Sequence, residues 1–228
     1  FSSELASNSV ISIREEWDSF PVLSVNLASD TDASAIHVGY DDIESLAINL
    51  GTNADTVAVF DTHHGETTVN AGPGNDQVAI QMIHGSTTIR SGVGDDTVNV
   101  GNTSRRLVDI HADLWIEGEG GTDIVNVDNG GSGANAFRTS DAAAGRLTST
   151  QLSGLNLDGV ITYGSAEFLN LLLGSGQDLF TIDGTHTGTT DIAGNTGTNV
   201  DDIRIKTISG TTNLSTGGGS DLVTVGNS

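Results

Sequence analysis

The chain has 228 residues, of which only 4% are aromatic and one is Met, so a large aromatic-rich globular core is not expected. Thirty acidic residues stand against eight basic ones, giving a formal net charge of −22, which argues against nucleic acid as a partner. The sequence has no cysteine, no apolar run that could span a membrane and no signal peptide, which excludes disulfides, thiolate sites and a membrane helix.

The first 39 residues form an atypical segment, with Trp17, Phe20 and Pro21 as local anomalies. The chain starts at Phe1 without a Met, so we expect a processed product or a segment of a longer protein. Helix periodicity is nearly absent throughout, whereas short alternating stretches of β-branched residues bounded by Gly, Asn, Asp and Ser are frequent.

Farther along, an aspartate recurs every 20 to 23 residues within each half of the chain, between a glycine-containing turn and a short strand. The segments read LGTNADTVAV from Leu50, AGPGNDQVAI from Ala71, SGVGDDTVNV from Ser91, LGSGQDLFTI from Leu173 and TGGGSDLVTV from Thr216. Their shared form is G-x-G-x-D-x-h-x-h, where h is apolar. A fixed period of this size predicts a repeat architecture in which each unit stacks on the next.

A second kind of turn alternates with the first and reads HHGETTV from His63, IHGSTTI from Ile83, HTGTTDI from His186 and ISGTTNL from Ile208. Two strands and two unlike turns in 20 to 23 residues describe one coil of a parallel β-solenoid, an all-β fold of the β-helix or β-roll type. Alternation predicts inward-facing residues, because successive side chains of a strand point to opposite faces. They are Val57, Val59, Val78, Ile80, Val98, Val100, Phe180, Ile182, Val223 and Val225.

The two halves also align with each other. At an offset of 123 residues, Tyr40 falls on Tyr163, Glu44 on Glu167 and Asp55 on Asp178, and the offset then becomes 125. We therefore expect one elongated solenoid over residues 1–228, with superrepeats at about 1–123 and 124–228, the second incomplete. Residues 128–164 lack the aspartate turn and predict a surface loop followed by one or two atypical coils. A short insertion around Arg105 and Arg106 lengthens one coil.

The aspartate turns resemble the nonapeptide G-G-x-G-x-D-x-h-x of the repeats-in-toxin (RTX) family of hemolysin-type calcium-binding proteins. The long unit resembles tandem repeats of very large secreted or cell-surface proteins. The resemblance implies calcium held between the turns of successive coils, since calcium takes six to eight oxygen ligands. The implied ligands are Asp55, Asp76, Asp96, Asp123, Asp178, Asp201 and Asp221, with the carbonyls of Gly72, Gly74, Gly92, Gly94, Gly174, Gly176, Gly217 and Gly219.

The chain departs from the RTX pattern in three ways. RTX turns recur every nine residues on both edges of a coil, whereas the acidic turn here comes once per coil, so we expect one edge to carry the row. Two residues are inserted before Asp201, and the first glycine of the motif is replaced throughout. An alternative reading is that each Asp caps its own turn. A row of stacked carboxylates, however, repels itself unless cations intervene or pKa values rise.

Other chemistry is less well supported by the sequence. His63, His64, His84 and His186 lie near equivalent corners, but no carboxylate pattern repeats with them, so we interpret them as turn residues. The eight basic residues are scattered over different repeats, and G-x-S-x-G is absent, so we do not expect an enzyme. The adjacent Thr pairs do not give the outward T-x-T rows of ice-binding solenoids.

We therefore expect an extracellular or cell-surface structural or adhesive rod, stiffened by calcium. The chain stops directly after a core strand, so its partner would be another copy stacked end to end, or a longer parent chain. Surfaces or polysaccharide are further candidate partners. The main alternative is a calcium-binding segment of a secreted effector or enzyme; a carbohydrate-binding or polysaccharide-degrading β-helix is a third.

Overall fold

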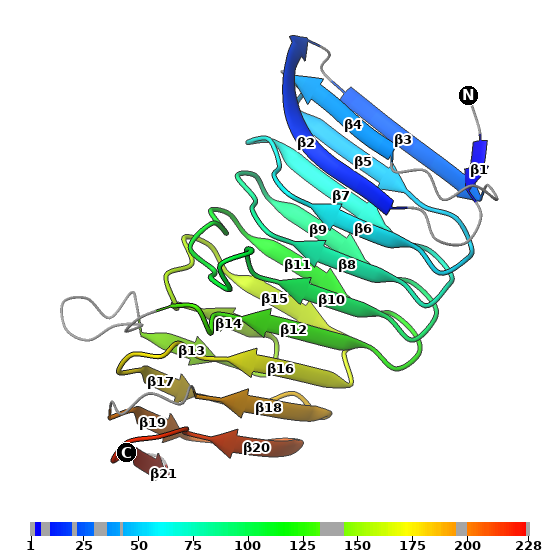
Figure 1. The fold of residues 1–228 in the computed structure, drawn as a ribbon. Coiled ribbons are helices and arrows are strands. Elements are labelled where there is room, and N and C mark those ends of the chain that lie inside the picture. The colour runs from blue at the N-terminus through cyan, green and yellow to red at the C-terminus, as the bar shows by residue number, and fades with distance from the viewer. Residues whose placement is uncertain are drawn as a thin grey trace.

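The computed structural model describes residues 43–132, 144–194 and 200–226 in full, and the strands 3–5, 10–19, 22–29 and 36–41 by their backbone. The described residues form 21 β-strands and no helix, so none could cross a membrane as a helix. The strands coil into an elongated stack of two facing sheets, with the N-terminal strands at one end and β21 at the other (Figure 1). The predicted parallel β-solenoid is confirmed.

One sheet has twelve strands and the other has nine. In spatial order the twelve-stranded sheet contains β1 (Ser3–Leu5), β3 (Val22–Ser29), β5 (Ser45–Asn49), β7 (Glu66–Asn70), β9 (Thr87–Arg90), β11 (Leu114–Glu117), β15 (Ile161–Gly164), β14 (Gln151–Ser153), β13 (Gly145–Leu147), β17 (Leu179–Ile182), β19 (Asp202–Ile205) and β21 (Leu222–Val225). The nine-stranded sheet contains β20 (Thr211–Ser215), β18 (Thr189–Ala193), β16 (Phe168–Leu172), β12 (Ile124–Asp128), β10 (Thr97–Val100), β8 (Gln77–Ile80), β6 (Thr56–Val59), β2 (Val10–Ser19) and β4 (Ile36–Asp41).

The chain alternates between the sheets, so each coil has two edges. We call first edge the turns that lead from the twelve-stranded to the nine-stranded sheet, such as the turn from β5 to β6. The turns in the opposite direction, such as that from β6 to β7, form the second edge. Neighbouring strands pair in parallel and in register; Val57 of β6, for example, lies beside Val78 of β8.

The core is a set of aliphatic ladders between the sheets, as the alternation predicts. Val57, Ile80 and Phe180 are among side chains that are at most 1% exposed. Burying such a side chain contributes about 1.5–3 kcal/mol. The exceptions are Val223 and Val225 of β21, which are 43% and 74% exposed because no further coil covers this strand in the structure.

The described part of segment 128–164 forms a meander in place of the atypical coils predicted. Its three short strands lie in the twelve-stranded sheet, where β14 runs antiparallel to both β13 and β15. The meander enters between β11 and β17 through the pairs β11–β15 and β13–β17. The expected surface loop falls mainly on residues 133–143, which lie outside the described residues. On the facing sheet, β12 pairs directly with β16.

This meander changes the phase of the solenoid. From β5 to the end of the meander the chain makes four and a half coils, so β16 starts on the opposite sheet from β5, its counterpart at an offset of 123 residues. The matched strands keep their lengths, as β6 (Thr56–Val59) and β17 (Leu179–Ile182) show, but exchange sheets. The prediction that the acidic turns share one edge is therefore wrong, because the unit contains a half-integer number of coils.

Candidate functional site: two rows of buried carboxylates

The first acid row lies on the first edge, where each acid immediately precedes a strand of the nine-stranded sheet. Its members are Asp55, Asp76, Asp96, Asp123 and Glu167. The backbone N–H of each of the four aspartates donates a hydrogen bond to the carboxylate of the next coil, the last of these being Glu167. The N···O distances along the row are 2.7, 2.7, 2.9 and 2.7 Å.

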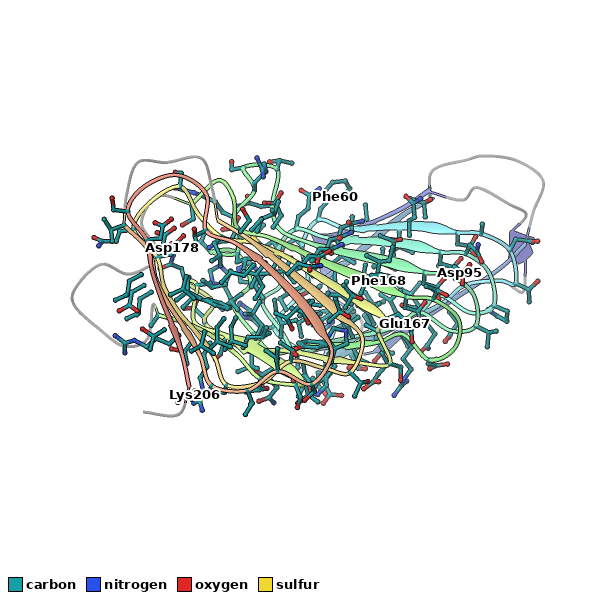
Figure 2. The ribbon with its side chains drawn as sticks, turned by 90° about the horizontal axis from the view of Figure 1, so that it is seen from below. Phe60, Asp95, Glu167, Phe168, Asp178 and Lys206 are labelled. Atoms are coloured by element: carbon teal, nitrogen blue, oxygen red, sulfur yellow. The ribbon has the colours of Figure 1, made fainter. Side chains whose placement is uncertain are left out.

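The second acid row lies on the second edge, before strands of the twelve-stranded sheet. The N–H of Asp178 donates to Oδ1 of Asp201 at 2.8 Å, and the N–H of Asp201 donates to Oδ1 of Asp221 at 3.1 Å. The two residues inserted before Asp201 therefore do not remove this aspartate from the row. Figure 2, a view down the solenoid, shows Asp178 at the opposite side from Glu167 and from Asp95, the neighbour of Asp96.

These hydrogen bonds fix the register between coils. A one-residue slip would move every acid away from the amide it accepts and would turn the buried valines outward. The same hydrogen bond forms between coils of different length. The bonded acids are 20 residues apart at Asp76 and Asp96 but 27 residues apart at Asp96 and Asp123. The lengthened coil predicted around Arg105 and Arg106 is confirmed by this spacing.

Six aspartates of the two rows are buried, and four of them are only half satisfied. Asp55, Asp76, Asp96, Asp123, Asp178 and Asp201 are all at most 4% exposed. Among the described residues, the second oxygen, Oδ2, of Asp55, Asp76, Asp96 and Asp123 is buried without a hydrogen-bond partner. A buried ionised oxygen without a partner is costly, so each Oδ2 favours either a proton or a cation.

The electrostatics of the rows follow from this burial. Desolvation raises the pKa of Asp76 to about 7, with the charges of Asp96 and Asp55 adding to the effect. Burial also raises the pKa of Asp123 to about 6, helped by the neighbouring charges of Asp96 and Glu167. The pKa values of Asp55, Asp96 and Asp201 are raised for the same first reason, the loss of water around the carboxylate.

The turn glycines allow the coils to approach closely. Gly94 has φ of 148°, and a Cβ built there would lie 1.6 Å from the carbonyl oxygen of Gly74 in the preceding coil. Six of the eight glycines predicted as calcium ligands have positive φ: Gly72, Gly74, Gly92, Gly94, Gly217 and Gly219. Gly174 and Gly176 do not share this conformation, so the turn before Asp178 differs from the others.

The predicted calcium ligands meet only part of what calcium needs. The Oδ2 atoms supply hard, unpartnered oxygens, and the cluster is acidic. However, one of the predicted carbonyls is already engaged, since Gly92 O accepts the amide hydrogen of Gly120 at 3.0 Å. Other carbonyls of the same turns do likewise, as Val93 O accepts from Gly74 N at 2.9 Å. In the described part of the chain, no three acidic or histidine side chains gather around one point as a metal cage. Calcium at these turns stays a prediction.

Glu167 was not predicted as a member of the row. It extends the row across the meander by taking the hydrogen bond that an Asp takes elsewhere, although 44 residues separate it from Asp123. Its place immediately before β16 was the available signal, since every other member stands immediately before its strand. The glutamate side chain is longer than an aspartate side chain, and its carboxylate reaches the amide of Asp123 from a turn that lacks the G-x-G pattern.

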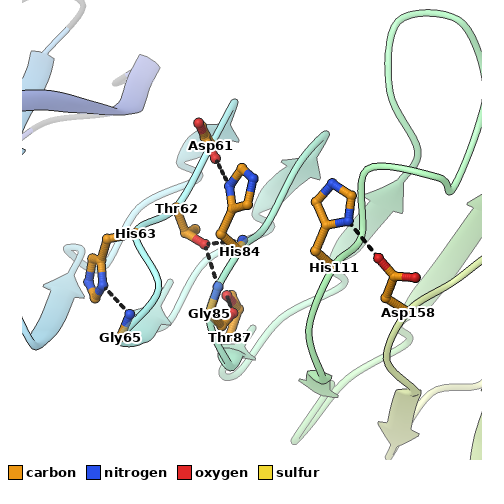
Figure 3. A network of polar contacts seen from close by, with 9 residues as sticks. All are labelled: Asp61, Thr62, His63, Gly65, His84, Gly85, Thr87, His111 and Asp158. Atoms are coloured by element: carbon orange, nitrogen blue, oxygen red, sulfur yellow. Dashed lines mark hydrogen bonds and ion pairs between the residues drawn. The ribbon is translucent and has the colours of Figure 1, made fainter.

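The histidines divide between the two edges. His64, His84 and His111 line the second edge, whereas His63 is buried and accepts a hydrogen bond from Gly65 N at Nδ1, 2.7 Å away. His186 lies on the first edge beside Tyr163 and does not join them. No carboxylate pattern repeats with the predicted histidines, but the structure pairs one of them, His84, with Asp61, and it pairs His111, which was not predicted, with Asp158 (Figure 3).

Two of the basic residues, predicted to be scattered, meet at one carboxylate. Arg146 of β13 pairs with Oδ2 of Asp183, and Lys206 Nζ lies 2.9 Å from Oδ1. These cations hold the pKa of Asp183 below its usual value, the hydrogen bond from Lys206 being the larger cause. The cluster is a surface ion-pair network that ties the meander to the following coils.

No family model, curated protein or solved structure matches the chain.

Proposed function

We propose that the chain is a structural or adhesive rod of an extracellular or cell-surface protein, whose role is to hold a fixed, extended shape. The observation that carries this proposal is the repetition of one contact, in which the amide of a buried acid bonds to the acid of the next coil. A contact repeated in coil after coil serves register and stiffness, whereas catalysis needs one distinct constellation of groups.

The polar groups that most resemble a catalytic set support the same view. A groove of about 370 Å³ is lined in part by Tyr163, Glu167 and His186. Glu167 Oε2 accepts the amide of Asp123, and the hydroxyl of Tyr163 donates to the carbonyl of Thr148 at 2.7 Å. His186 Nδ1 lies 3.0 Å from the hydroxyl of Thr190. Glu167 thus joins two coils, while the Tyr163 and His186 groups are engaged within the meander and within one turn.

End-to-end stacking is part of this proposal, and the exposed side chains of Leu222 and Val225 on β21 are the kind of surface that it would cover. Electron microscopy of the native material tests this proposal. We expect filaments or thin rods whose width is one solenoid. Compact particles carrying a separate catalytic activity would contradict the rod and favour a segment of a secreted effector.

Calcium stiffening is a second candidate, favoured by the unpartnered Oδ2 atoms of the first acid row. Calcium would supply positive charge to oxygens that otherwise need a proton, with Asp76 and Asp96 among the residues that would hold it. The test is a calcium titration of chelator-treated protein, followed by thermal unfolding. A midpoint that rises with calcium supports the candidate, and an unchanged midpoint removes it without affecting the rod.

A further inference from the structure

A row of three imidazoles runs along the second edge. His64, His84 and His111 come from three successive turns of that edge, and the ring centroids are 5.3 Å apart between His64 and His84 and 5.0 Å between His84 and His111. The planes of His84 and His111 are inclined by only 27°. The side chains of these two residues are 31% and 35% exposed, so solvent and small ions reach them.

Two of the three rings, those of His84 and His111, are each held by a carboxylate. His84 Nδ1 lies 2.8 Å from Oδ1 of Asp61, and His111 Nδ1 lies 2.8 Å from Oδ2 of Asp158 (Figure 3). An ionised carboxylate can only accept, so Nδ1 carries the hydrogen and Nε2 keeps its lone pair. Among the described residues, neither Nε2 has a hydrogen-bond partner.

This arrangement is typical of metal-binding histidines, which almost always donate the other ring N–H to a carboxylate, carbonyl or water. The carboxylate fixes the tautomer and makes the other ring nitrogen a stronger electron-pair donor to a metal. The two carboxylates come from different places. Asp61 lies in the turn between β6 and β7, one coil before the turn of His84, whereas Asp158 comes from the segment between β14 and β15.

The spacing of the rings matches a two-imidazole chelate. With a metal–nitrogen bond of about 2.0–2.1 Å, each ring centroid lies roughly 3.2 Å from the metal, and a tetrahedral angle then separates the centroids by about 5.2 Å. The observed 5.0 Å between His84 and His111 is within a few tenths of this value. The rings need to tilt toward each other but do not need to move apart.

We propose that His84 and His111 bind a late first-row divalent metal ion, Cu²⁺, Ni²⁺ or Zn²⁺, through their Nε2 atoms. Imidazole suits these ions and not calcium, and Cu²⁺ binds tightest of the three. Asp61 and Asp158 are positioning residues that orient the rings, and His64 flanks the pair. In the described residues no three metal-binding side chains converge, so the protein gives two ligands and water completes the shell.

The experiment is a Cu²⁺ titration of the whole chain near neutral pH, by calorimetry and electron paramagnetic resonance, with excess Ca²⁺ present to occupy the acidic surface. We expect one tightly bound Cu²⁺ per chain, with a spectrum that reports imidazole nitrogen. His84→Gln and His111→Gln should each abolish that spectrum. Asp158→Asn should weaken binding about 10- to 100-fold while leaving the nitrogen signal, because a carboxylate that orients a ligand contributes that much.

The matched control is His186→Gln, which removes an imidazole from the first edge that, among the described residues, is bonded to no carboxylate and contacts no second imidazole. It should bind Cu²⁺ as the unchanged chain does. Circular dichroism of each variant without metal separates loss of ligand from loss of fold. The proposal is overturned if the His84 and His111 variants keep the tight site, or if His186→Gln removes it. It is also overturned if Asp158→Asn binds as tightly as the unchanged chain.

Discussion

Replacing Asp76 by Asn separates the two roles of a carboxylate in the first acid row. Asp76 accepts the N–H of Asp55 through Oδ1 at 2.7 Å, while its Oδ2 is buried without a partner. Asn keeps an acceptor for that amide and has nearly the same shape, but it cannot ionise. Any difference between Asp76→Asn and the unchanged chain that depends on pH therefore reports the proton at position 76.

The expected size follows from the pKa of Asp76, which burial raises from 3.8 to about 7. Because the folded pKa lies above the unfolded one, the stabilisation is fully present below pH 3.8 and is lost as the pH rises through 7. At ~1.36 kcal/mol per pKa unit, the loss by pH 8 is at most about 4 kcal/mol. In the variant, a buried amide group without a partner costs about 1–3 kcal/mol at every pH.

The two effects cross. At about pH 4, where the stabilisation from the proton is still almost complete, we expect Asp76→Asn to be less stable than the unchanged chain by about 1–3 kcal/mol. At pH 8 the difference should vanish or reverse, because the unchanged chain has then lost the stabilisation from its proton. Urea unfolding at several pH values between about 4 and 8.5 measures this difference.

The matched control is Asp95→Asn in the adjoining turn. Asp95 also accepts an amide of the next coil, from Thr122 at 2.9 Å, but its side chain is exposed. Its replacement should shift stability by the same small amount at pH 5 and pH 8. If the stability of Asp76→Asn follows the same pH dependence as the unchanged chain, the row does not hold a proton at Asp76, and the reasoning fails.

Three further outcomes are expected. Gly94→Ala should lower the free energy of unfolding by about 3 kcal/mol or more, or prevent folding. Gly120→Ala, whose Cβ meets nothing within 4 Å, should lower it by under about 1 kcal/mol. Equal thermal midpoints of the two variants would contradict the close approach of the turns. Asp183→Asn should lower the free energy of unfolding by up to about 1 kcal/mol above pH 5 and should leave it unchanged near pH 2, because the paired cations lower the pKa of Asp183. A larger loss of stability in acid would refute this role of the ion pairs. If calcium replaces the proton, it should raise the thermal midpoint more at pH 8 than at pH 5, and the reverse order would exclude competition for Oδ2.

Much of the fold is local in origin and could be read from the residues. Alternation placed Val57 and Ile80 in the core, and the structure buries both. The recurrence of Asp55, Asp76 and Asp96 before a strand gave the coil length, because each acid has to meet the amide one coil away. These features depend on neighbours along the chain and on a repeat that every coil shares.

Parts of the candidate site could not be predicted because they depend on which coils become neighbours. Glu167 joins Asp123 only after the intervening residues are folded into the meander. Asp158 reaches His111 from 47 residues away, so the carboxylate that accompanies the ring leaves no spacing pattern to find. His186 occupies a turn like those of His64 and His84 but lies on the other edge.

The sequence by itself therefore determined the coil, its inward-facing residues and the acids that hold register, because these are set by two-residue alternation and a period near 20 residues. Only the tertiary structure decided that the acids form two rows on opposite edges. The physical reason is the meander β13–β15, which fills a half-coil in one sheet while β12 pairs directly with β16 in the other. The following repeat consequently starts half a turn out of phase.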